Sequence, residues 1–406
     1  MNAAGIKQRG IFALWLVVLL PALIAFFALL LESTYLFAVR HRQQTATDAA
    51  ALGGAYQLLR HDEPGMAAAA SYAAASNGFP SGAETTLDIA HPPLDGSYAG
   101  EELAVRARIE HQPSRLLAAV VPGMQPLIGT TATARFRRAS CLHALAPATA
   151  ESLNVAADAV VEGPFCSAQV NSTVASALRI RNRARVTLLD LRVAGSASVH
   201  ASATVSPTPV SGAASTPDPL LALPEPAVGA CDYTNRVVNG TVTLSPGTYC
   251  GGLRINASSR ANLSPGNYII VGGLLDLRNL ATIAGNNVTL FLMQGAYMQM
   301  NASATVILTA PSSGVHGGVV FFESRAAPLD AATHTLPMTT NALIEGIVYL
   351  PRSKLSLTST TPTPANASAR NLVLIARNLN LAGFIRINVD PSLVPEGLRS
   401  RAWLIE

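Results

Sequence analysis

The sequence predicts a mainly β protein with an N-terminal membrane-spanning helix, in which a small α+β domain is followed by a right-handed parallel β-helix solenoid. Ile11–Leu31 carries no charged residue over 21 positions, which is enough to span a bilayer. From Cys141 onward, short apolar runs recur between Asn, Gly, Ser and Pro residues, as in repeat proteins. Aromatic residues make up only 5% of the chain, which favours thin, repeated layers over a bulky core.

The apolar segment Ile11–Leu31 has the dimensions of a membrane span. At a rise of about 1.5 Å per residue, its helix is about 31 Å long, which matches the hydrocarbon core of a bilayer. The segment leaves through Leu30-Leu31-Glu32-Ser33 and lacks the small-x-small site of a cleaved signal peptide. The sequence therefore predicts an uncleaved signal anchor.

The helical pattern continues beyond the span. Small or apolar residues recur every three or four positions from Tyr35 to Gly53, which predicts one helix from Ile11 to about Leu59 within residues 1–60. Small residues let two helices approach closely, so the end of this helix is predicted to offer a contact face to a partner helix. The residues of this face are Asp48, Ala49, Ala50, Gly53 and Gly54.

Residues 61–139 are predicted to form a small α+β domain. The alanine-rich stretch Met66–Ala75 is typical of a helix, and Leu103–Ile109 and Thr130–Phe136 alternate as strands do. Ser114–Val121 is predicted to be a short helix between these strands.

Residues 140–406 are predicted to form the repeat body. Leu244-Ser-Pro-Gly-Thr-Tyr249 returns as Leu263-Ser-Pro-Gly-Asn-Tyr268 at an offset of 19 residues, a period typical of solenoids. Several short strands per period, without a helical pattern, fit a parallel β-helix in which each coil buries a face only against its neighbours. Six prolines interrupt the strands within 206–226, which is predicted to be a strap or linker between two blocks of coils.

All four cysteines lie in the repeat body and form two sequence-local pairs, Cys141 with Cys166 and Cys231 with Cys250. The second pair is 19 residues apart, which is one repeat, and adjacent coils of a β-helix lie about 4.8 Å apart, within reach of a disulfide. The pattern thus predicts two disulfides that connect adjacent coils. Free buried thiols are the alternative.

Flanking charge does not decide the orientation of the span. Lys7 and Arg9 before it are balanced by Arg40 and Arg42 after it. Disulfides persist mainly outside the cytoplasm, so the cysteines place the body in the periplasm or at the cell surface.

The N-terminal region resembles that of the TadG-like proteins of Tad/Flp pilus assembly. Arg9-Gly10 precedes the span, and Gln43–Gly54 contains the aspartate-triple-alanine motif Asp48–Ala51. Cys141–Leu145 and Leu244–Gly252 resemble the repetitive C-terminal body of such proteins. The resemblance implies a single-pass protein of the bacterial inner membrane, a non-enzymatic component of a pilus-assembly or secretion apparatus. The implied partners are the lipid bilayer and other Tad/Flp pilus-assembly or pseudopilin-like membrane proteins.

Two positions depart from related patterns. Asp95-Gly-Ser97-Tyr-Ala99 has alanine where a DxSxS metal motif has its second serine, so no metal site is predicted. Trp15 stands where prepilins carry a glutamate five residues after the cleavage glycine, which argues against processing by a prepilin peptidase.

The competing interpretation is a β-helix surface protein that binds or processes polysaccharide. Glycoside hydrolysis needs two carboxylates on one bond, and the carboxylates of the body show no one-coil pairing. They are Asp276, Glu323, Asp330, Glu345 and Asp390. His316 lies between glycines, which a turn explains, and neither a nucleotide-binding motif nor a catalytic triad stands out, so we expect no enzyme and no cofactor. The net charge of +4 comes from scattered arginines, which gives little support to nucleic-acid binding.

One charged feature stands out in the body. Arg179, Arg181, Arg183 and Arg185 alternate with other residues, which predicts that all four lie on the solvent face of one strand. A functional interpretation is an anion-binding ridge for surface polysaccharide or an acidic partner.

Overall fold

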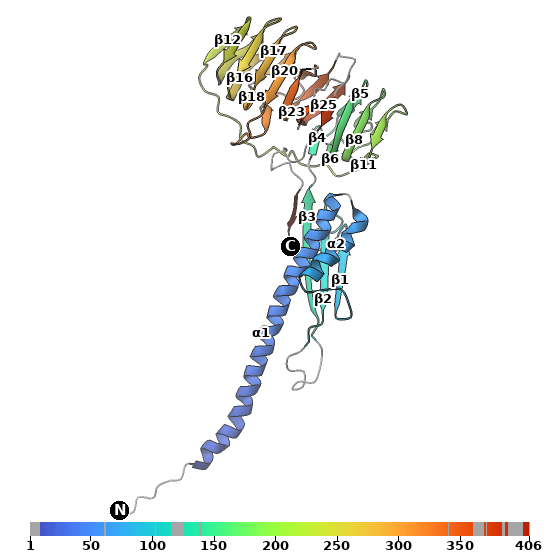
Figure 1. Ribbon diagram of the computed structural model, residues 1–406, viewed down its shortest axis with the longest axis vertical. Coiled ribbons are helices and arrows are strands. Elements are labelled where there is room, and N and C mark those ends of the chain that lie inside the picture. The colour runs from blue at the N-terminus through green and yellow to red at the C-terminus, as the bar shows by residue number, and fades with distance from the viewer. Residues whose placement is uncertain are drawn as a thin grey trace, which may run out of the picture. The chain divides into compact units, whose positions relative to one another are not determined.

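The structure is a computed structural model in which the chain forms two compact units, residues 1–137 with 401–406 and residues 138–400 (Figure 1). It describes residues 9–60, 62–101, 103–114, 126–137, 140–339, 341–359, 369–370, 372–383, 386–388 and 401–405. The protein is mostly β, with an N-terminal apolar helix and a parallel β-solenoid of about 10 turns, so the predicted fold class is confirmed.

The first unit packs two helices on one antiparallel sheet. The helices are α1 (Arg9–Leu59) and α2 (Glu63–Ser76). The sheet has the order β1-β2-β3-β27, formed by β1 (Thr85–Ala90), β2 (Ala104–His111), β3 (Ile128–Arg137) and β27 (Arg401–Leu404). Asp62 caps α2, because its carboxylate accepts a hydrogen bond from the Gly65 amide at 3.0 Å. The helix predicted over Ser114–Val121 falls almost entirely outside the described residues.

The core of the first unit follows the period of its strands. Val105, Ala107 and Ile109 alternate along β2 and point to the helices, where they are fully buried. Phe136 of β3 and Ala402 of β27 extend the same face, as their cross-strand pairing requires. The sheet therefore buries one apolar face under α1 and α2.

The last strand of the chain belongs to this sheet, an arrangement that the sequence did not indicate. β27 pairs antiparallel with β3, with Ala402 opposite Phe136 and Trp403 opposite Arg135. The chain thus leaves the first unit after β3 and returns to it for β27. The solenoid is an insertion between two neighbouring strands of one sheet.

The solenoid is built from two blocks of parallel strands. The first block contains β4 (Ser140–Ala144), β5 (Leu153–Ala156), β6 (Val160–Val170), β7 (Leu178–Ile180), β8 (Arg185–Val193), β9 (Ala197–Val199), β10 (Thr204–Ser206) and β11 (Val210–Ser211). The second block contains β12 (Tyr233–Val238), β13 (Thr241–Leu244), β14 (Gly247–Ile255), β15 (Arg260–Leu263), β16 (Gly266–Leu277), β17 (Thr282–Gly285), β18 (Val288–Met293), β19 (Tyr297–Met300), β20 (Thr305–Thr309), β21 (Val319–Glu323), β22 (Thr333–Pro337), β23 (Leu343–Thr358), β24 (Ala369–Arg370), β25 (Leu372–Ala382) and β26 (Arg386–Asn388).

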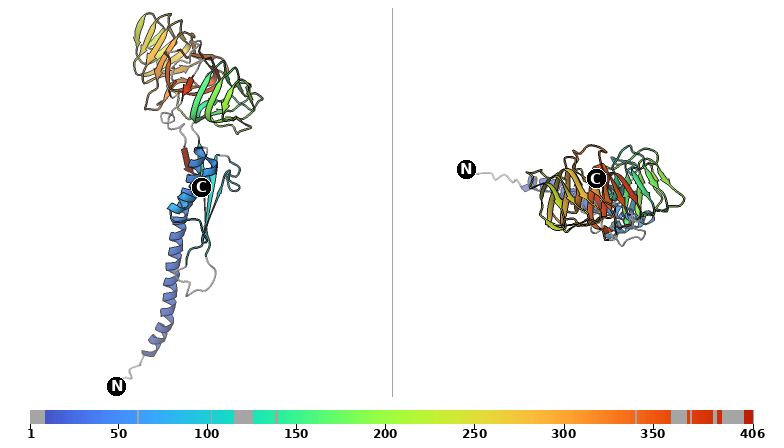
Figure 2. Two further views of the ribbon diagram at one scale, coloured as in Figure 1. Left: turned by 45° about the vertical axis from the view of Figure 1, so that its right-hand side comes forward. Right: turned by 90° about the horizontal axis from the view of Figure 1, so that it is seen from above.

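The coils do not stack in the order of the sequence. β12 lies at one end and is followed in space by β14, β16, β18, β21, β23 and β25 (Figure 1). The next coil contains β4, the first strand of the body, because Leu374 of β25 pairs with Leu142 and Leu142 pairs with Ala168 of β6. β8, β10 and β11 complete the other end, and both further views show the same succession (Figure 2). The first and last coils therefore meet in the middle of one continuous core.

The repeated tyrosines explain the sequence repeat. Tyr249 and Tyr268 are fully buried in adjacent coils, and their rings stack with centroids 5.8 Å apart. Each hydroxyl donates to the backbone carbonyl four residues earlier, of Ser245 at 2.7 Å and Ser264 at 2.9 Å. A buried ring with its hydroxyl satisfied by its own turn stabilises each coil in the same way.

Both predicted disulfides are present. Cys141 of β4 is bonded to Cys166 of β6, with Cα atoms 5.7 Å apart, and Cys231 to Cys250 of β14, with Cα atoms 5.6 Å apart. The first bond connects the first two coils of the chain. The second fixes the beginning of the second block to the coil of β14.

Removal of the Cys231–Cys250 bond is expected to destabilise the end of the solenoid. A disulfide that closes a loop of this length contributes about 3 kcal/mol by restricting the unfolded chain. The double variant Cys231→Ser, Cys250→Ser should therefore melt at a lower temperature than the oxidised protein, measured on the full chain by circular dichroism. The reduced wild type loses both disulfides and should melt no higher than the variant, which keeps Cys141–Cys166. Equal melting temperatures for the oxidised wild type and the variant would contradict the expectation.

Candidate functional site

The N-terminal half of α1 is apolar and exposed. Within the described residues, this is a helix long and apolar enough to cross a membrane, and no protein atoms bury its most apolar window. A soluble protein rarely exposes so large an apolar surface, so a bilayer is the environment that this surface fits. Its exposed residues include Val17, Leu19, Leu20, Leu23, Ile24, Phe26, Phe27, Leu29, Leu30 and Leu31.

The C-terminal half of α1 docks on the sheet through Gln43. The side chain is fully buried, and its Nε2 donates to the carbonyls of Ile109 and Ile128, each at 2.8 Å. These carbonyls lie at the end of β2 and the beginning of β3. One amide nitrogen thus donates to a carbonyl of each of two neighbouring strands and fixes the helix against them.

Polar residues close to Gln43 in α1 continue this contact with the sheet. The hydroxyls of Thr47 and Thr130 are 2.6 Å apart, in the buried layer between α1 and β3. Gln44 donates from Nε2 to Asp48 at 2.8 Å and to the carbonyl of Thr131 at 3.0 Å. Asp48 of the aspartate-triple-alanine motif therefore orients a glutamine that binds the sheet.

The small residues of the motif complete the packing. Ala50 is fully buried, and a Cβ atom on Gly54 would lie 3.2 Å from Val105 Cγ1 of the sheet. A Cβ atom on Gly53 would lie 3.2 Å from the backbone oxygen of Ala69 in α2. Ala49 is half-buried. The predicted contact face is thus formed, but its partner is the protein's own α2 and sheet, so the prediction that a separate helix binds Ala50, Gly53 and Gly54 is corrected.

The comparison with known families finds a match over the same helix, α1. A family described as putative Flp pilus-assembly TadE/G-like matches residues 10–57. The N-terminal segment is TadE/G-like. This match confirms the predicted resemblance at the N terminus, and its limits nearly coincide with those of α1. No curated protein and no solved structure matched the chain. The TadE/G-like segment is therefore one helix, with an apolar half and a half that docks on the sheet.

The arginine row does not lie on one strand. Arg179 belongs to β7, Arg181 and Arg183 lie in the turn that follows, and Arg185 begins β8. The backbone turns at Asn182 and Arg183, whose φ angles of 55° and 60° are incompatible with a strand. The prediction of a single strand face is therefore wrong.

Carboxylates of the preceding coil hold most of this row. Arg183 Nε donates to Asp158 Oδ1 at 2.7 Å, and this hydrogen bond lowers the pKa of Asp158. Glu151 pairs with Arg179 and, at 3.7 Å, with Arg181. Part of the positive charge is thus neutralised, and anion binding by the row stays a prediction.

Glu323, one of the acidic residues considered for catalysis, is held inside the body. Glu323 is 2% exposed and accepts hydrogen bonds from Ser353 Oγ, from the Arg352 amide at 3.0 Å and from His334 Nε2 at 3.2 Å. Because the Met298 amide donates to His334 Nδ1 at 3.1 Å, the histidine proton is on Nε2. A serine, a histidine and a glutamate meet here, yet all three are enclosed, and Glu323 binds both of the others.

Two of the other carboxylates considered for catalysis are paired with arginines, one is half-buried and one lies outside the described residues. Asp276 accepts from Arg254 Nε at 3.0 Å and from Arg278 Nε at 2.8 Å. Asp330 accepts from Arg377 Nε at 2.8 Å. Glu345 is half-buried within β23, and Asp390 lies outside the described residues.

The outer face of one solenoid sheet carries an apolar column that is buried beneath a strap. Phe291, Phe322, Tyr349 and Ile375 are successive cross-strand neighbours, and none is exposed by more than 1%. Residues 212–226 cross this column, with Leu220 and Leu223 packed against the core, while the preceding β11 still pairs with β8 at the end of the first block. The proline-rich strap therefore supplies a missing layer of core, because prolines cannot join the sheet beneath it.

Hydrogen bonds hold the strap across several coils. The Tyr349 hydroxyl donates to Asp218 Oδ2 at 2.6 Å, and His316 donates from Nε2 to the Pro224 carbonyl at 2.8 Å. The histidine between glycines thus has a structural role. On the first block, His143 Nε2 lies 3.1 Å from Thr216 Oγ1.

Acid is expected to weaken the body through His143. Burial beneath the strap lowers the pKa of this histidine to about 4, while the unfolded chain keeps a value near 6.5. The unfolded state binds the proton first, so stability is full above pH 6.5 and falls as the pH decreases toward 4, by roughly 3 kcal/mol. Urea unfolding of the wild type and of His143→Gln at pH 7 and 4.5 gives the free energy of unfolding of each protein. Only the wild type should lose the contribution of the histidine at the lower pH. An equal pH dependence in both would contradict it.

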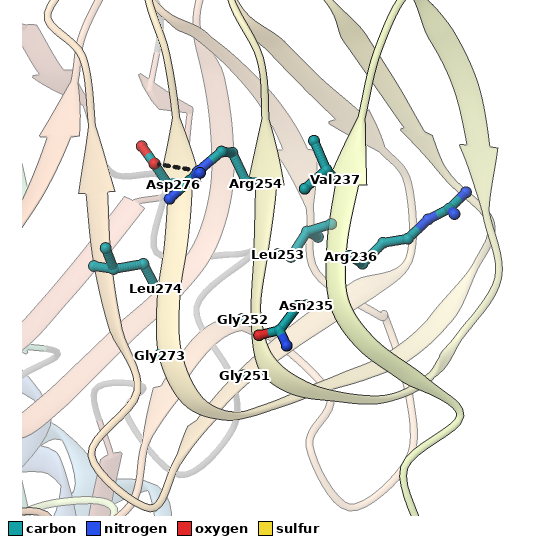
Figure 3. Close-up of a pocket in the computed structure, with 10 residues that line it drawn as sticks. All are labelled: Asn235, Arg236, Val237, Gly251, Gly252, Leu253, Arg254, Gly273, Leu274 and Asp276. Carbon is teal, nitrogen blue, oxygen red and sulfur yellow. Dashed lines mark hydrogen bonds and ion pairs between the residues drawn. The ribbon is translucent and has the colours of Figure 1, made fainter.

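A shallow hollow of about 250 Å³ lies at the β12 end of the solenoid (Figure 3). Val237 of β12, Arg254 of β14 and Asp276 of β16 are successive cross-strand neighbours along it. The register shifts between β14 and β16 at the hollow, where Gly252 and Gly273 have φ angles of 105° and 67°. A Cβ atom on Gly252 would clash with the backbone of Leu274, so this bend requires glycine.

Proposed function

We propose that the protein is a non-enzymatic component of a Tad/Flp-type pilus-assembly or secretion apparatus, with a single pass through the bacterial inner membrane. The observation that carries this proposal is that the TadE/G-like match coincides with α1, whose first half has a bare apolar surface. In this proposal the exposed half of α1 contacts lipid and membrane-embedded partners. The docked half fixes the α+β domain and the solenoid beyond the membrane.

The two disulfides support a location of the solenoid in the periplasm or at the cell surface. Both connect neighbouring coils of the inserted body, and such bonds are rare in the cytoplasm. The enclosed Glu323, His334 and Ser353 support a structural role for the most triad-like group in the described residues.

Cross-linking in native membranes tests the proposal. The full chain should be captured with Tad/Flp pilus-assembly proteins after treatment with a membrane-permeant cross-linker, identified by mass spectrometry. A matched sample in which the envelope is solubilised before cross-linking should lose these partners. Capture without any component of the pilus apparatus would contradict the proposed role, and turnover of a polysaccharide by the purified protein would contradict its non-enzymatic part.

A further inference from the structure

The β11 end of the solenoid is an open strand edge. Among the described residues, β9 pairs only with β7, and β10 and β11 pair only with β8 (Figure 1). The strap that follows β11 turns back onto the preceding coil, because the Gly212 amide donates to the Gly195 carbonyl at 3.1 Å. Pro207 and Pro209 lie between β10 and β11, so the strands keep their amides. The outer edges of three strands are therefore a template for pairing with further strands.

The apolar interior is uncovered at the same end. Val199 of β9 is the cross-strand neighbour of Ile180, which is 1% exposed, yet Val199 itself is 42% exposed. Val205 of β10 is only partly buried, although its neighbour Val186 on β8 is buried. Solenoids usually cover such an end with a capping element. The last coil thus lacks the layer that covers each interior coil.

The end coil also carries no charged residue. Residues 194–217 contain no Asp, Glu, Lys or Arg, although these residues make up 13% of the chain. Natural proteins usually protect an exposed edge with charges, above all with charges at inward positions. The β12 end has this protection, because Arg236 is the cross-strand neighbour of the buried Leu253 and its guanidinium points away from Arg254 (Figure 3). The two ends of the solenoid therefore differ, and only the β11 end is both open and neutral.

The molecule already contains one contact between coils that do not follow each other in the chain. β25 pairs with β4 and β5, and β26 pairs with β6, so the last coil of the sequence stacks on the first. One continuous core runs through this junction. A coil edge of this protein is thus a surface that another coil edge fits. A second β11 end offers such an edge, and two neutral edges meet without electrostatic repulsion.

We propose that the β11 end is a self-association surface, at which two copies of the chain pair end to end about a two-fold axis. The strands of the two copies then run antiparallel, and each copy covers Val199 and Val205 of the other. The β12 ends, with Arg236, stay at the outside, so association stops at the dimer. The proposal goes beyond the proposed role in pilus assembly and does not depend on it.

Light scattering of the full chain in detergent tests this inference. With increasing concentration, the mass of the protein part should double and then stay constant. Val199→Lys should stay monomeric over the same range, because pairing would bury an unpaired charge. Val237→Lys is the matched control, because Val237 is 41% exposed at the β12 end, and this variant should dimerise as the wild type does. Circular dichroism of both variants separates a loss of pairing from a loss of folding.

Nitroxide labels locate the contact. In the two-fold pair, labels on Thr208→Cys, in the turn between β10 and β11, lie near the contact in both copies. Labels on Thr234→Cys of β12 lie about 10 turns away in each copy, which at about 4.8 Å per turn separates them by about 100 Å. Pulsed electron paramagnetic resonance should therefore detect dipolar coupling for the first pair only.

Four results would overturn the inference. The full chain stays monomeric at every concentration, correctly folded Val199→Lys dimerises as the wild type does, correctly folded Val237→Lys loses the dimer, or the labels on Thr234→Cys couple. The last two results would mean that the β12 end takes part in the contact.

Discussion

Two arginines in the apolar half of α1 are expected to release the protein from the membrane. Leu20 and Ile24 are exposed and lie one turn apart near the middle of the span. Each arginine there costs about 2.5–3.5 kcal/mol for insertion, so Leu20→Arg with Ile24→Arg costs roughly 6 kcal/mol. We expect the variant to move from the carbonate-washed membrane pellet to the soluble or degraded fraction, as measured by immunoblotting.

A control for this variant lies on the same helix outside the span. Thr45 is exposed on the docked half of α1, so Thr45→Arg adds charge where no lipid is expected. This variant should stay in the membrane pellet. Retention of the double-arginine variant in the washed pellet would mean that the apolar half of α1 is not the membrane anchor.

Leucines at Ala50 and Gly54 are expected to unfold the α+β domain while the protein stays in the membrane. Ala50 is fully buried, and at Gly54 even a Cβ atom would lie 3.2 Å from Val105 and 3.4 Å from Met66. Overpacking typically costs 1–3 kcal/mol per site, so the two changes cost about 2–6 kcal/mol, a large part of the stability of a small domain. Hydrogen exchange of β2 and β3 in the full chain should become fast.

Tyr56→Leu is the matched control, because Tyr56 lies on the same helix but is 55% exposed to solvent. Its replacement should leave hydrogen exchange of β2 and β3 slow. Slow exchange in the leucine variant at Ala50 and Gly54 would contradict the docking seen here. An assembly defect of that variant therefore reports on folding. The proposed contacts with proteins of the pilus apparatus are better tested at exposed positions such as Phe37, which is 75% exposed.

The helix and the repeats were predictable because both depend on local pattern. An uncharged run ending at Leu31 and small residues at helical spacing predict α1 without any partner. Likewise, Tyr249 and Tyr268 follow the same Leu-Ser-Pro-Gly turn, and each hydroxyl is satisfied within that turn. The spacing of Cys231 and Cys250 equals this period, and Cys141 and Cys166 are separated by one somewhat longer coil, so both disulfides were predicted correctly.

The sequence predicted the candidate site only in part. It indicates which residues pack closely, but not which surface they pack against. Small residues such as Gly53 and Gly54 indicate a close contact, and the sequence does not say whether the contact is internal. The arginine row failed for a related reason. Alternation of Arg179 to Arg185 resembles a strand, and only the left-handed backbone at Asn182 and Arg183 reveals the turn.

The sequence by itself determined the apolar half of α1, the coil period and the residues that form the disulfides. Only the tertiary structure decided that α1 docks on its own sheet, that β27 closes that sheet, and that the first coil stacks against the last. The reason is that backbone hydrogen bonds join strands whatever their side chains. Any coil edge can therefore pair with another, and the pairing of Leu142 with Leu374 leaves no local signal in the sequence.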